Sequence, residues 1–400
     1  MEIESVEKLT VKRQLKDYVR EHVLRWFPHV RYVTYVRVEM EDGTVGYGEE
    51  LPFQTWQNTR QQMISLVEGK NPVEFMNRDI GAGLRMAILD AMGKKTGSPI
   101  HRLLGTQKRE EVDMAWWLPD MDLESYREGI ENGVENGYST VKIKARPWRD
   151  LSKIVLELDS EFGDSVDLYM DFNDNIRNVS RAREVLEEID DRDIVSGIES
   201  PMPARNLEAY EKLSESLSSD LEVHYGRSSA HPLPHPGEEV FEKMFNVYVT
   251  GGSLQEMVRE DAVLEAAGKD MFLQLRGAET SATYAAHIAA VLKQAKRGVN
   301  VRHDLYAGSP VEGGLKPVRG AARVPEKPGL GVEIDWTGLK SRETVELESL
   351  NPNVDCRIHY SADRAAEMTF SSTVEMEEAA RRGELPLFAE GATIETEFLD

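Results

Sequence analysis

Between residues 111 and 335, short apolar runs alternate with stretches of helical periodicity, and this alternation limits the folds open to the chain. Seven strands are predicted, at residues 140–143, 166–170, 194–198, 221–225, 247–250, 271–275 and 299–302. Helical patterns lie between them, at 150–162, 180–189, 206–217, 254–267 and 281–295. Repeated βα units of this number favour a closed parallel barrel over an open sheet. In a barrel, the polar residues that follow the strands meet at one face, where active sites lie.

The segments on either side of this region have different patterns. Residues 1–110 contain apolar alternation near their start and a hairpin pattern that turns at 41–43. A buried helix closed by glycine is predicted at 84–93. These signals indicate a small α+β unit. The tail beyond Trp336 is acidic, with little continuous periodicity beyond a predicted strand at 369–374 and a short helix at 375–382.

Composition excludes several classes of protein. The formal net charge of −23 argues against a nucleic-acid partner, because such binders need clustered Lys and Arg to neutralise phosphates. The sequence has no apolar run of about 18 residues and no basic-then-apolar start, so neither a membrane span nor a secretory signal is supported. The single cysteine, Cys356, excludes an intramolecular disulfide and a multi-cysteine zinc site. We expect a cytoplasmic protein with no membrane partner, in which oxygen or histidine would bind any metal.

Two lysines one residue apart lie in the β-branched run of the strand predicted at 140–143. Alternate side chains of a strand share a face, so Lys142 and Lys144 would project together and repel each other. A lysine held beside another cation has a lowered pKa and can act as a base near neutral pH. The alternative is a solvated edge strand that carries two surface lysines.

Acidic and amide side chains close the next two predicted strands. Asp171 and Asn173 share a face and offer oxygen donors that suit a hard cation, although a plain turn after a strand uses the same residue types. Glu199 closes an apolar strand just before Ser200 and Pro201. Lysines after one strand, Asp-x-Asn after the next and Glu after the third would converge around one cavity. That order is far more specific than any single piece.

With these residues in this order, the chain resembles the mandelate racemase and muconate lactonising branch of the enolase superfamily. The resemblance covers most of the chain. Residues 43–49 resemble the hairpin of the capping domain, 87–105 resemble the helix that enters the barrel, and 328–333 resemble the signature on leaving it. The resemblance implies an α/β fold, a modified TIM barrel (β/α)7β with an α+β capping domain. We therefore expect the capping domain at 1–110, the barrel at 111–335, and a C-terminal segment at 336–400 that packs back on the cap.

The same resemblance implies a metal-dependent lyase. A Mg²⁺ or Mn²⁺ ion would stabilise the enediolate formed when a base removes the proton α to a carboxylate. On matching positions, Lys144 would be the base and Lys142 its electrostatic companion. Asp171 and Glu199 would be metal ligands, and Asn173 a supporting polar group.

The fifth predicted strand departs from the family pattern. The resemblance implies a third acidic metal ligand there, and Arg227 stands in its place. Arginine cannot ligate a cation. Three explanations remain open: His224 or Tyr225 supplies a replacement ligand, the metal is weakly bound or absent, or Arg227 binds the substrate carboxylate. His224 is the best substitute by chemistry, although strand alternation puts it opposite in parity to Arg227 and a lone histidine there can be structural.

The family's second catalytic group is also missing from the sequence. The sixth-strand region, 248–253, has no lysine or aspartate, and the seventh, 274–279, has no histidine in the expected place. A two-base racemase or epimerase is therefore disfavoured, and so is a cycloisomerase. The eighth strand ends in Arg302, His303 and Asp304, which can supply an acid or substrate contacts, while a helix cap is the alternative use of Asp304.

Cationic and aromatic residues also lie in the part of the cap that closes over the substrate in this family. They are His22, Arg25, Trp26 and His29. Cationic side chains at this place suit an anionic acid. Each of them taken alone could equally be a surface residue.

We therefore expect a lyase that removes the α-proton of a carboxylate and dehydrates a sugar acid through Lys144. One base that later acts as an acid can run a syn elimination, which fits the missing opposite group. The alternative is a barrel that has lost catalysis and binds an anionic ligand or a partner protein. The expected cofactor is Mg²⁺ or Mn²⁺, the expected partner is a small carboxylate substrate, and a homo-oligomer is usual for relatives. The expected residues are Lys144, Lys142 and His303 for catalysis, Asp171, Glu199 and His224 for the metal, and Asn173, Tyr225, Arg227, Arg276, Arg302, His22 and Arg25 for the substrate.

Overall fold

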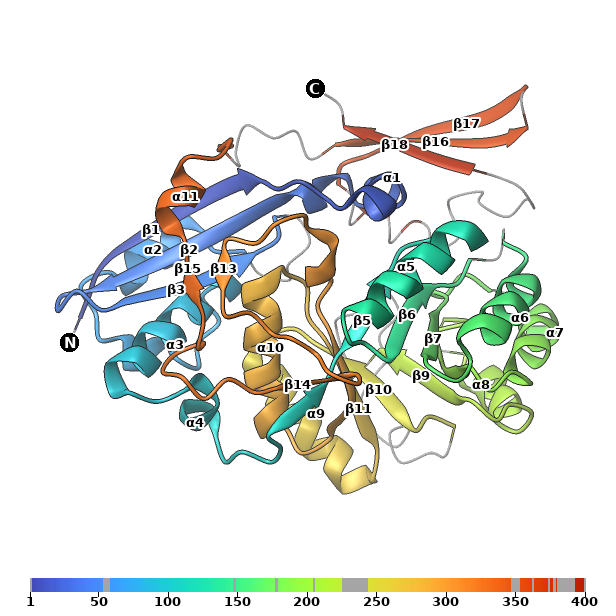
Figure 1. The fold of residues 1–400 in the computed structure, drawn as a ribbon, viewed down its shortest axis with the longest axis horizontal. Coiled ribbons are helices and arrows are strands. Elements are labelled where there is room, and N and C mark those ends of the chain that lie inside the picture. Colours follow the sequence, from blue (N-terminus) through green and yellow to red (C-terminus); the bar gives the residue numbers. More distant parts are fainter. Residues whose placement is uncertain are drawn as a thin grey trace.

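Three sheets of three or more strands follow one another along the described part of the chain: an antiparallel sheet, a parallel barrel and a second antiparallel sheet (Figure 1). The computed structural model describes residues 2–52, 58–146, 149–176, 179–203, 206–224, 244–346, 353–361, 363–372, 375–376, 379 and 393–398. Within these residues, no helix has both the length and the apolar character needed to cross a membrane.

The barrel is an eight-stranded sheet in which each strand pairs in parallel with the next one in sequence. An isolated parallel bridge between Met114 and Val299 brings the first and last strands together, so that the sheet is nearly closed. Its strands are β5 (Ala115–Leu118), β6 (Thr140–Lys144), β7 (Asp167–Asp171), β8 (Val195–Glu199), β9 (Asp220–His224), β10 (Val247–Thr250), β11 (Asp270–Gln274) and β12 (Ala295–Asn300). This arrangement confirms the predicted α/β barrel.

Helices connect the strands on the outside of the barrel (Figure 1). They are α5 (Leu123–Glu135), α6 (Leu151–Phe162), α7 (Val179–Asp190), α8 (Leu207–Ser214), α9 (Leu254–Ala267) and α10 (Glu279–Val291). Local capping explains where several of them begin and end. Asp122 and Asp150 accept hydrogen bonds from the first turns of α5 and α6. In α9, Ser253 and Glu256 form a capping box, and Gly268 ends the helix in the left-handed conformation.

The structure differs from the sequence-based prediction at the first and last barrel units. The strand β5 and the helix α5 were not among the predicted elements. The strand gives little signal, because Ala115 to Leu118 are buried on both faces and show no alternation. The helix predicted to run to Ala295 ends at Val291, and β12 begins at Ala295 rather than at Val299.

The N-terminal unit is an antiparallel sheet of β1 (Ile3–Lys12), β2 (Tyr32–Met40) and β3 (Val45–Glu50). The helix α3 (Ala82–Thr96) packs against β2 and β3 at very close range. A Cβ on Gly46 would overlap the carbonyl oxygen of Ala87, so glycine is needed for this approach. The other helical segments are α1 (Asp17–Trp26), η1 (Pro28–Arg31), α2 (Gln61–Val67), η2 (Pro72–Phe75) and α4 (Ile100–Leu104).

Buried polar contacts join this unit to the barrel. The guanidinium of Arg13, which is fully buried, pairs with Glu279 at 2.9 Å and donates to the hydroxyl of Tyr35 at 2.7 Å. The carboxylate of Glu49 on β3 accepts from the backbone N–H groups of Ala278 and Ser281 at the start of α10, each at 2.7 Å. A carboxylate at a helix N-terminus is favourably placed. These contacts fix the N-terminal unit against the barrel helix α10.

The C-terminal part adds α11 (Trp336–Lys340) and a sheet of order β17-β16-β18. Its strands are β16 (Val354–Ser361), β17 (Arg364–Phe370) and β18 (Thr393–Phe398). The strand β18 lies beside α1 (Figure 1) and also contacts η1. Short pairings complete the chain: β4 (Glu111–Asp113) with β14 (Ala321–Arg323), and β13 (Val311–Glu312) with β15 (Glu333–Ile334). Most of the helix predicted at 375–382 lies outside the described residues, and the three domain boundaries stay a prediction.

Candidate active site

A row of charged side chains crosses four adjacent strands of the barrel. In the sheet register, Lys144 on β6 pairs with Asp171 on β7, which pairs with Glu199 on β8. Glu199 pairs in turn with Glu222 on β9. Residues paired in a parallel sheet point to the same face, and all four are buried. Lys142 reaches Gln274 on β11, which places this face in the barrel interior.

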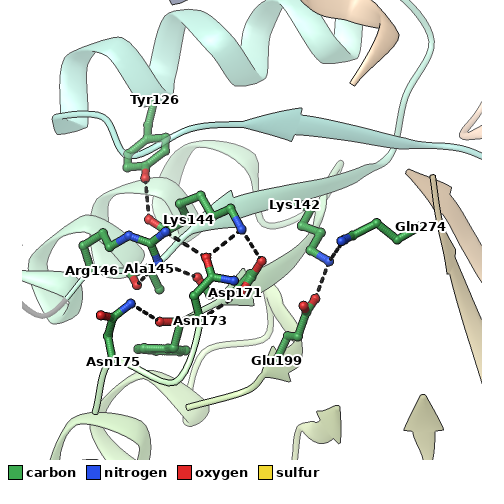
Figure 2. A network of polar contacts seen from close by, with 11 residues as sticks. Tyr126, Lys142, Lys144, Ala145, Arg146, Asp171, Asn173, Asn175, Glu199 and Gln274 are labelled. Atoms are coloured by element: carbon green, nitrogen blue, oxygen red, sulfur yellow. Dashed lines mark hydrogen bonds and ion pairs between the residues drawn. The ribbon is translucent and has the colours of Figure 1, made fainter. Parts of the chain in front are cut away.

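Lys144 lies at the carboxyl end of β6 and is 5% exposed. Its ammonium group forms an ion pair with Asp171 and donates to Oδ1 of Asn173 at 2.7 Å (Figure 2). Burial lowers the pKa of Lys144 to about 7; the Asp171 charge opposes this shift, and the positive charges of Arg146 and Arg302 add to it. An amine with this pKa is present partly in its neutral form near neutral pH and can accept a proton.

Lys142 is held by different partners from Lys144. Its ammonium group forms an ion pair with Glu199 and donates to Oε1 of Gln274 at 2.7 Å (Figure 2). It also lies 4.8 Å from the centre of the Phe272 ring. The two lysines therefore turn to different carboxylates. Among the nearby cations, Arg146 and Arg302 lower the pKa of Lys144, and the predicted role of Lys142 as its electrostatic companion stays a prediction.

The three carboxylates of the row differ in their surroundings. Asp171 accepts from Lys144 and from the backbone N–H of Asn173 at 3.0 Å. Burial alone would raise the pKa of Asp171, but the nearby cations, Lys144 first, hold it well below its usual range. Glu222 has no hydrogen-bond partner for either carboxylate oxygen among the described residues. Burial and the charge of Glu199 raise the pKa of Glu222 well above its ordinary value.

The donor set of this row fits a hard divalent cation. Asp171, Glu199 and Glu222 are buried oxygen ligands, and among the described residues no donor bonds to the Glu222 carboxylate, which leaves its oxygens open to a cation. In the described ranges, however, no group of three His, Cys, Asp or Glu side chains stands in a metal-binding cluster. Lysine ammonium groups contact two of the three carboxylates instead. A metal bound here would be held by Asp171, Glu199 and Glu222 and would take the place of these lysine contacts.

The residues predicted on the fifth strand are only partly described. His224 is the last residue of β9, and its side chain lies outside the described part of the structure, as do Tyr225 and Arg227 entirely. Whether one of these supplies a ligand stays a prediction. Glu222, two residues before the end of the same strand, was missed by the sequence reasoning. An acid inside the apolar run Leu221-Glu222-Val223 was the signal that could have found it.

The residues predicted at the end of the eighth strand, Arg302, His303 and Asp304, follow β12 and lie outside the row of charged side chains. His303 lies in η5 (His303–Leu305), with Nδ1 at 2.9 Å from the Asp304 carboxylate and Nε2 at 2.7 Å from the Tyr138 hydroxyl. Neither contact joins His303 to Lys144, and its catalytic role stays a prediction. The guanidinium of Arg302 lies over the rings of Trp117 and Phe27, at 4.3 and 4.6 Å from their centres.

The remaining predicted substrate residues are spread over two elements. Arg276 follows the end of β11 by two residues, and His22 lies half-buried in α1. Arg25 also belongs to α1, but its side chain lies outside the described set. The helix α1 lies beside α5 of the barrel as well as β18, so this part of the cap covers the barrel unit that precedes β6. Their contacts with a substrate stay predictions.

Three further side chains of the site escaped the sequence reasoning. Arg146, two residues after β6, donates from Nη2 to Oδ1 of Asn173 at 2.8 Å (Figure 2). Gln274 closes β11 and holds Lys142, and the Tyr126 hydroxyl donates to the carbonyl oxygen of Lys144 at 2.9 Å. Each acts through contacts between elements far apart in the sequence, for which spacing carries no signal.

Comparison with known proteins finds a matching family and several similar enzymes. The family described as enolase C-terminal domain-like matches residues 125–338. The N-succinyl-L-Arg/Lys racemase of Bacillus cereus is 23% identical over 328 residues, which cover 76% of this chain and 88% of the racemase. The arabinonate dehydratase of Saccharolobus solfataricus is 24% identical over 336 residues, 76% of this chain and 89% of the dehydratase. The solved muconate lactonising enzyme from Pseudomonas putida has a TM-score of 0.66 at 20% identity, and the alignment covers 86% of this chain and all of that enzyme.

Proposed function

Because the chain belongs to the mandelate racemase and muconate lactonising branch of the enolase superfamily, we propose that it removes the α-proton of a sugar acid and eliminates water. The observation that carries this proposal is the state of Lys144, which is buried, has a pKa lowered to about 7, and contacts both Asp171 and Asn173. A base for carbon acids needs to be neutral at the working pH and shielded from water.

The chain's own residues account for the proton transfers. The neutral amine of Lys144 accepts the proton from the carbon α to the carboxylate, and the electron pair of that C–H bond moves toward the carboxylate. The resulting ammonium then donates its proton to the hydroxyl group that leaves the β-carbon, which releases water and an enol that becomes a keto acid. Lys144 thus returns to its neutral form. A divalent cation held by Asp171, Glu199 and Glu222 would supply positive charge that offsets the charge developing on the substrate carboxylate.

The side chains that close β10 and β11 support elimination by one base. Thr250 closes β10 and Gln274 closes β11, and neither side chain is a base near neutral pH. A racemase needs a second acid on the other face of the substrate, whereas a syn elimination uses one group twice. The likeness to the arabinonate dehydratase supports the sugar-acid class, since that enzyme's name specifies a sugar acid and a dehydration.

The test measures metal binding and then proton exchange. Calorimetric titration with Mg²⁺ should give a saturable heat. In D2O with Mg²⁺, arabinonate and other five- and six-carbon sugar acids should lose their C2 proton signal and yield a 2-keto-3-deoxy acid. Lys144→Ala should lower the rate of C2 proton exchange and the rate of dehydration about 100-fold or more, because a positioned base contributes that much. Lys153→Ala is the matched control, because Lys153 is an exposed lysine on the barrel helix α6.

Three other outcomes would refute parts of the proposal. Exchange without water loss on these acids would favour a racemase. Persistent exchange in Lys144→Ala would remove Lys144 as the base. No Mg²⁺ or Mn²⁺ binding together with no exchange would leave the alternative of a barrel that binds an anionic ligand or a partner protein.

A further inference from the structure

The side-chain amide of Asn173 stands between two cations. Its Oδ1 accepts from Nζ of Lys144 at 2.7 Å and from Nη2 of Arg146 at 2.8 Å (Figure 2). Arg146 is 6% exposed, and its Nη1 also lies 3.2 Å from the carbonyl oxygens of Ala145 and Asp171. Three hydrogen bonds therefore tie this guanidinium to the end of β7 and to the loops that follow β6 and β7.

Arg146 decides which way the amide of Asn173 faces. An amide can turn about its last bond and present either an oxygen that accepts or an NH2 group that donates. A guanidinium has only donors, so it can bond to Asn173 only through the oxygen. The backbone of Asn173 is also restricted, with a φ of 48° and its N–H bonded to Asp171 at 3.0 Å. With Arg146 in place, Oδ1 is the atom that Lys144 meets.

The direction of the amide matters for a lysine that works as a base. A neutral amine has two N–H groups and one lone pair in a roughly tetrahedral arrangement. When Asp171 and Oδ1 of Asn173 accept the two N–H groups, the lone pair must point in the remaining direction. An amide turned the other way would donate its NH2 group to that lone pair and block it.

We propose that Arg146 is a positioning residue, which holds Oδ1 of Asn173 toward Lys144 and thereby keeps the lone pair of the base open to the substrate. This inference rests on the proposed function, because it gives Lys144 the role of base. It assigns a role to a residue that contacts Lys144 through Asn173.

The test is a double-mutant cycle on the sugar acid that the wild type dehydrates, with saturating Mg²⁺. Arg146→Met should lower kcat about 10- to 100-fold with KM within about twofold, because misplacing a reacting group costs that much without weakening binding. Asn173→Gly removes the amide and suits the positive φ. The double variant should be no slower than the slower single variant, since both changes remove one unit.

Two further variants separate positioning from loss of structure. Arg146→Lys keeps a group that can only donate and should recover part of the kcat lost in Arg146→Met. Arg149→Met is the matched control, because Arg149 follows on the same loop and pairs with Asp120 at 2.9 Å rather than with Asn173. It should keep the wild-type kcat even if its melting temperature falls.

The outcomes are distinguishable. Additive losses in the double variant, a raised KM with unchanged kcat, or a Lys variant no better than the Met variant would each overturn the role of Arg146. If the wild type removes no α-proton from any acid, the proposed function fails, and the role of Arg146 falls with it. If the wild type is active and Arg146→Met matches it, only the role of Arg146 falls.

Discussion

The pH dependence of stability should reveal the buried carboxyl of Glu49. This side chain lies where β3 meets the start of α10, and burial together with the charge of Glu279 raises its pKa from 4.5 to about 7. Because the folded state then holds the proton more tightly than the unfolded state, ionisation of Glu49 costs stability as the pH rises from 4.5 through 7. The perturbation we propose is Glu49→Gln, which removes this ionisation and keeps an oxygen for the N–H groups of Ala278 and Ser281.

The size of the effect follows from the two pKa values. With 1.36 kcal/mol for each pKa unit, the ionisation of Glu49 costs about 0.8 kcal/mol at pH 5 and about 3.3 kcal/mol at pH 8. The wild type should therefore lose about 2.5 kcal/mol relative to Glu49→Gln between these two pH values. A fixed cost of burying the amide would be the same at both pH values and would cancel in this difference.

The assay is urea unfolding of both proteins at pH 5 and pH 8, with the free energy of unfolding extrapolated to water. Glu211→Gln, on the exposed face of α8, is the control and should show no such pH-dependent difference. If the gap between Glu49→Gln and the wild type is the same at both pH values, the carboxyl does not titrate as we infer. If this difference in the free energy of unfolding grows toward acid pH, the pKa of Glu49 is lowered rather than raised by folding.

Three other perturbations test separate parts of the structure. Gly46→Ala should lower the free energy of unfolding by about 2 kcal/mol or more, since the new methyl group would overlap the Ala87 carbonyl, whereas Gly314→Ala, with open space around it, should change little in thermal melting. Burial lowers the pKa of His287 from 6.5 to about 4. The unfolded state binds the proton more readily, so the wild type should lose about 2 kcal/mol relative to His287→Gln between pH 8 and pH 5, and equal losses in urea unfolding would refute this. Glu222→Gln should weaken Mg²⁺ binding about tenfold or more in calorimetric titration, and unchanged affinity would remove Glu222 from the metal ligands.

Local signals were sufficient for much of the fold. The predicted bounds of β10 and α9 match the structure, because a β-branched run and a capping box act within a few residues of their own position. The strand β5 was not predicted, since its two adjacent tryptophans are both buried and the strand lacks the alternation of one covered face. Its burial depends on α5 and on the cap, neither of which can be seen in four residues of sequence.

Some residues of the candidate site could also be found from local signals, whereas others could not. The sequence alone identified Lys142, Lys144, Asp171 and Glu199. Lys144, Asp171 and Glu199 each close a strand of a repeated βα unit, and strand ends of a parallel barrel meet at one face. Lys142 lies two residues before the end of β6, on the same face as Lys144.

Only the tertiary structure decided how these residues pair. It directs Lys142 to Glu199 and Gln274, brings Glu222 into register with Glu199, and sets Arg146 against Asn173. These contacts depend on strand register and on the closure of the barrel, which join residues far apart in the chain. The order of residues along the sequence specifies which chemical groups are present. The pKa of Lys144 and the orientation of its amine depend instead on partners that only folding brings within hydrogen-bond distance.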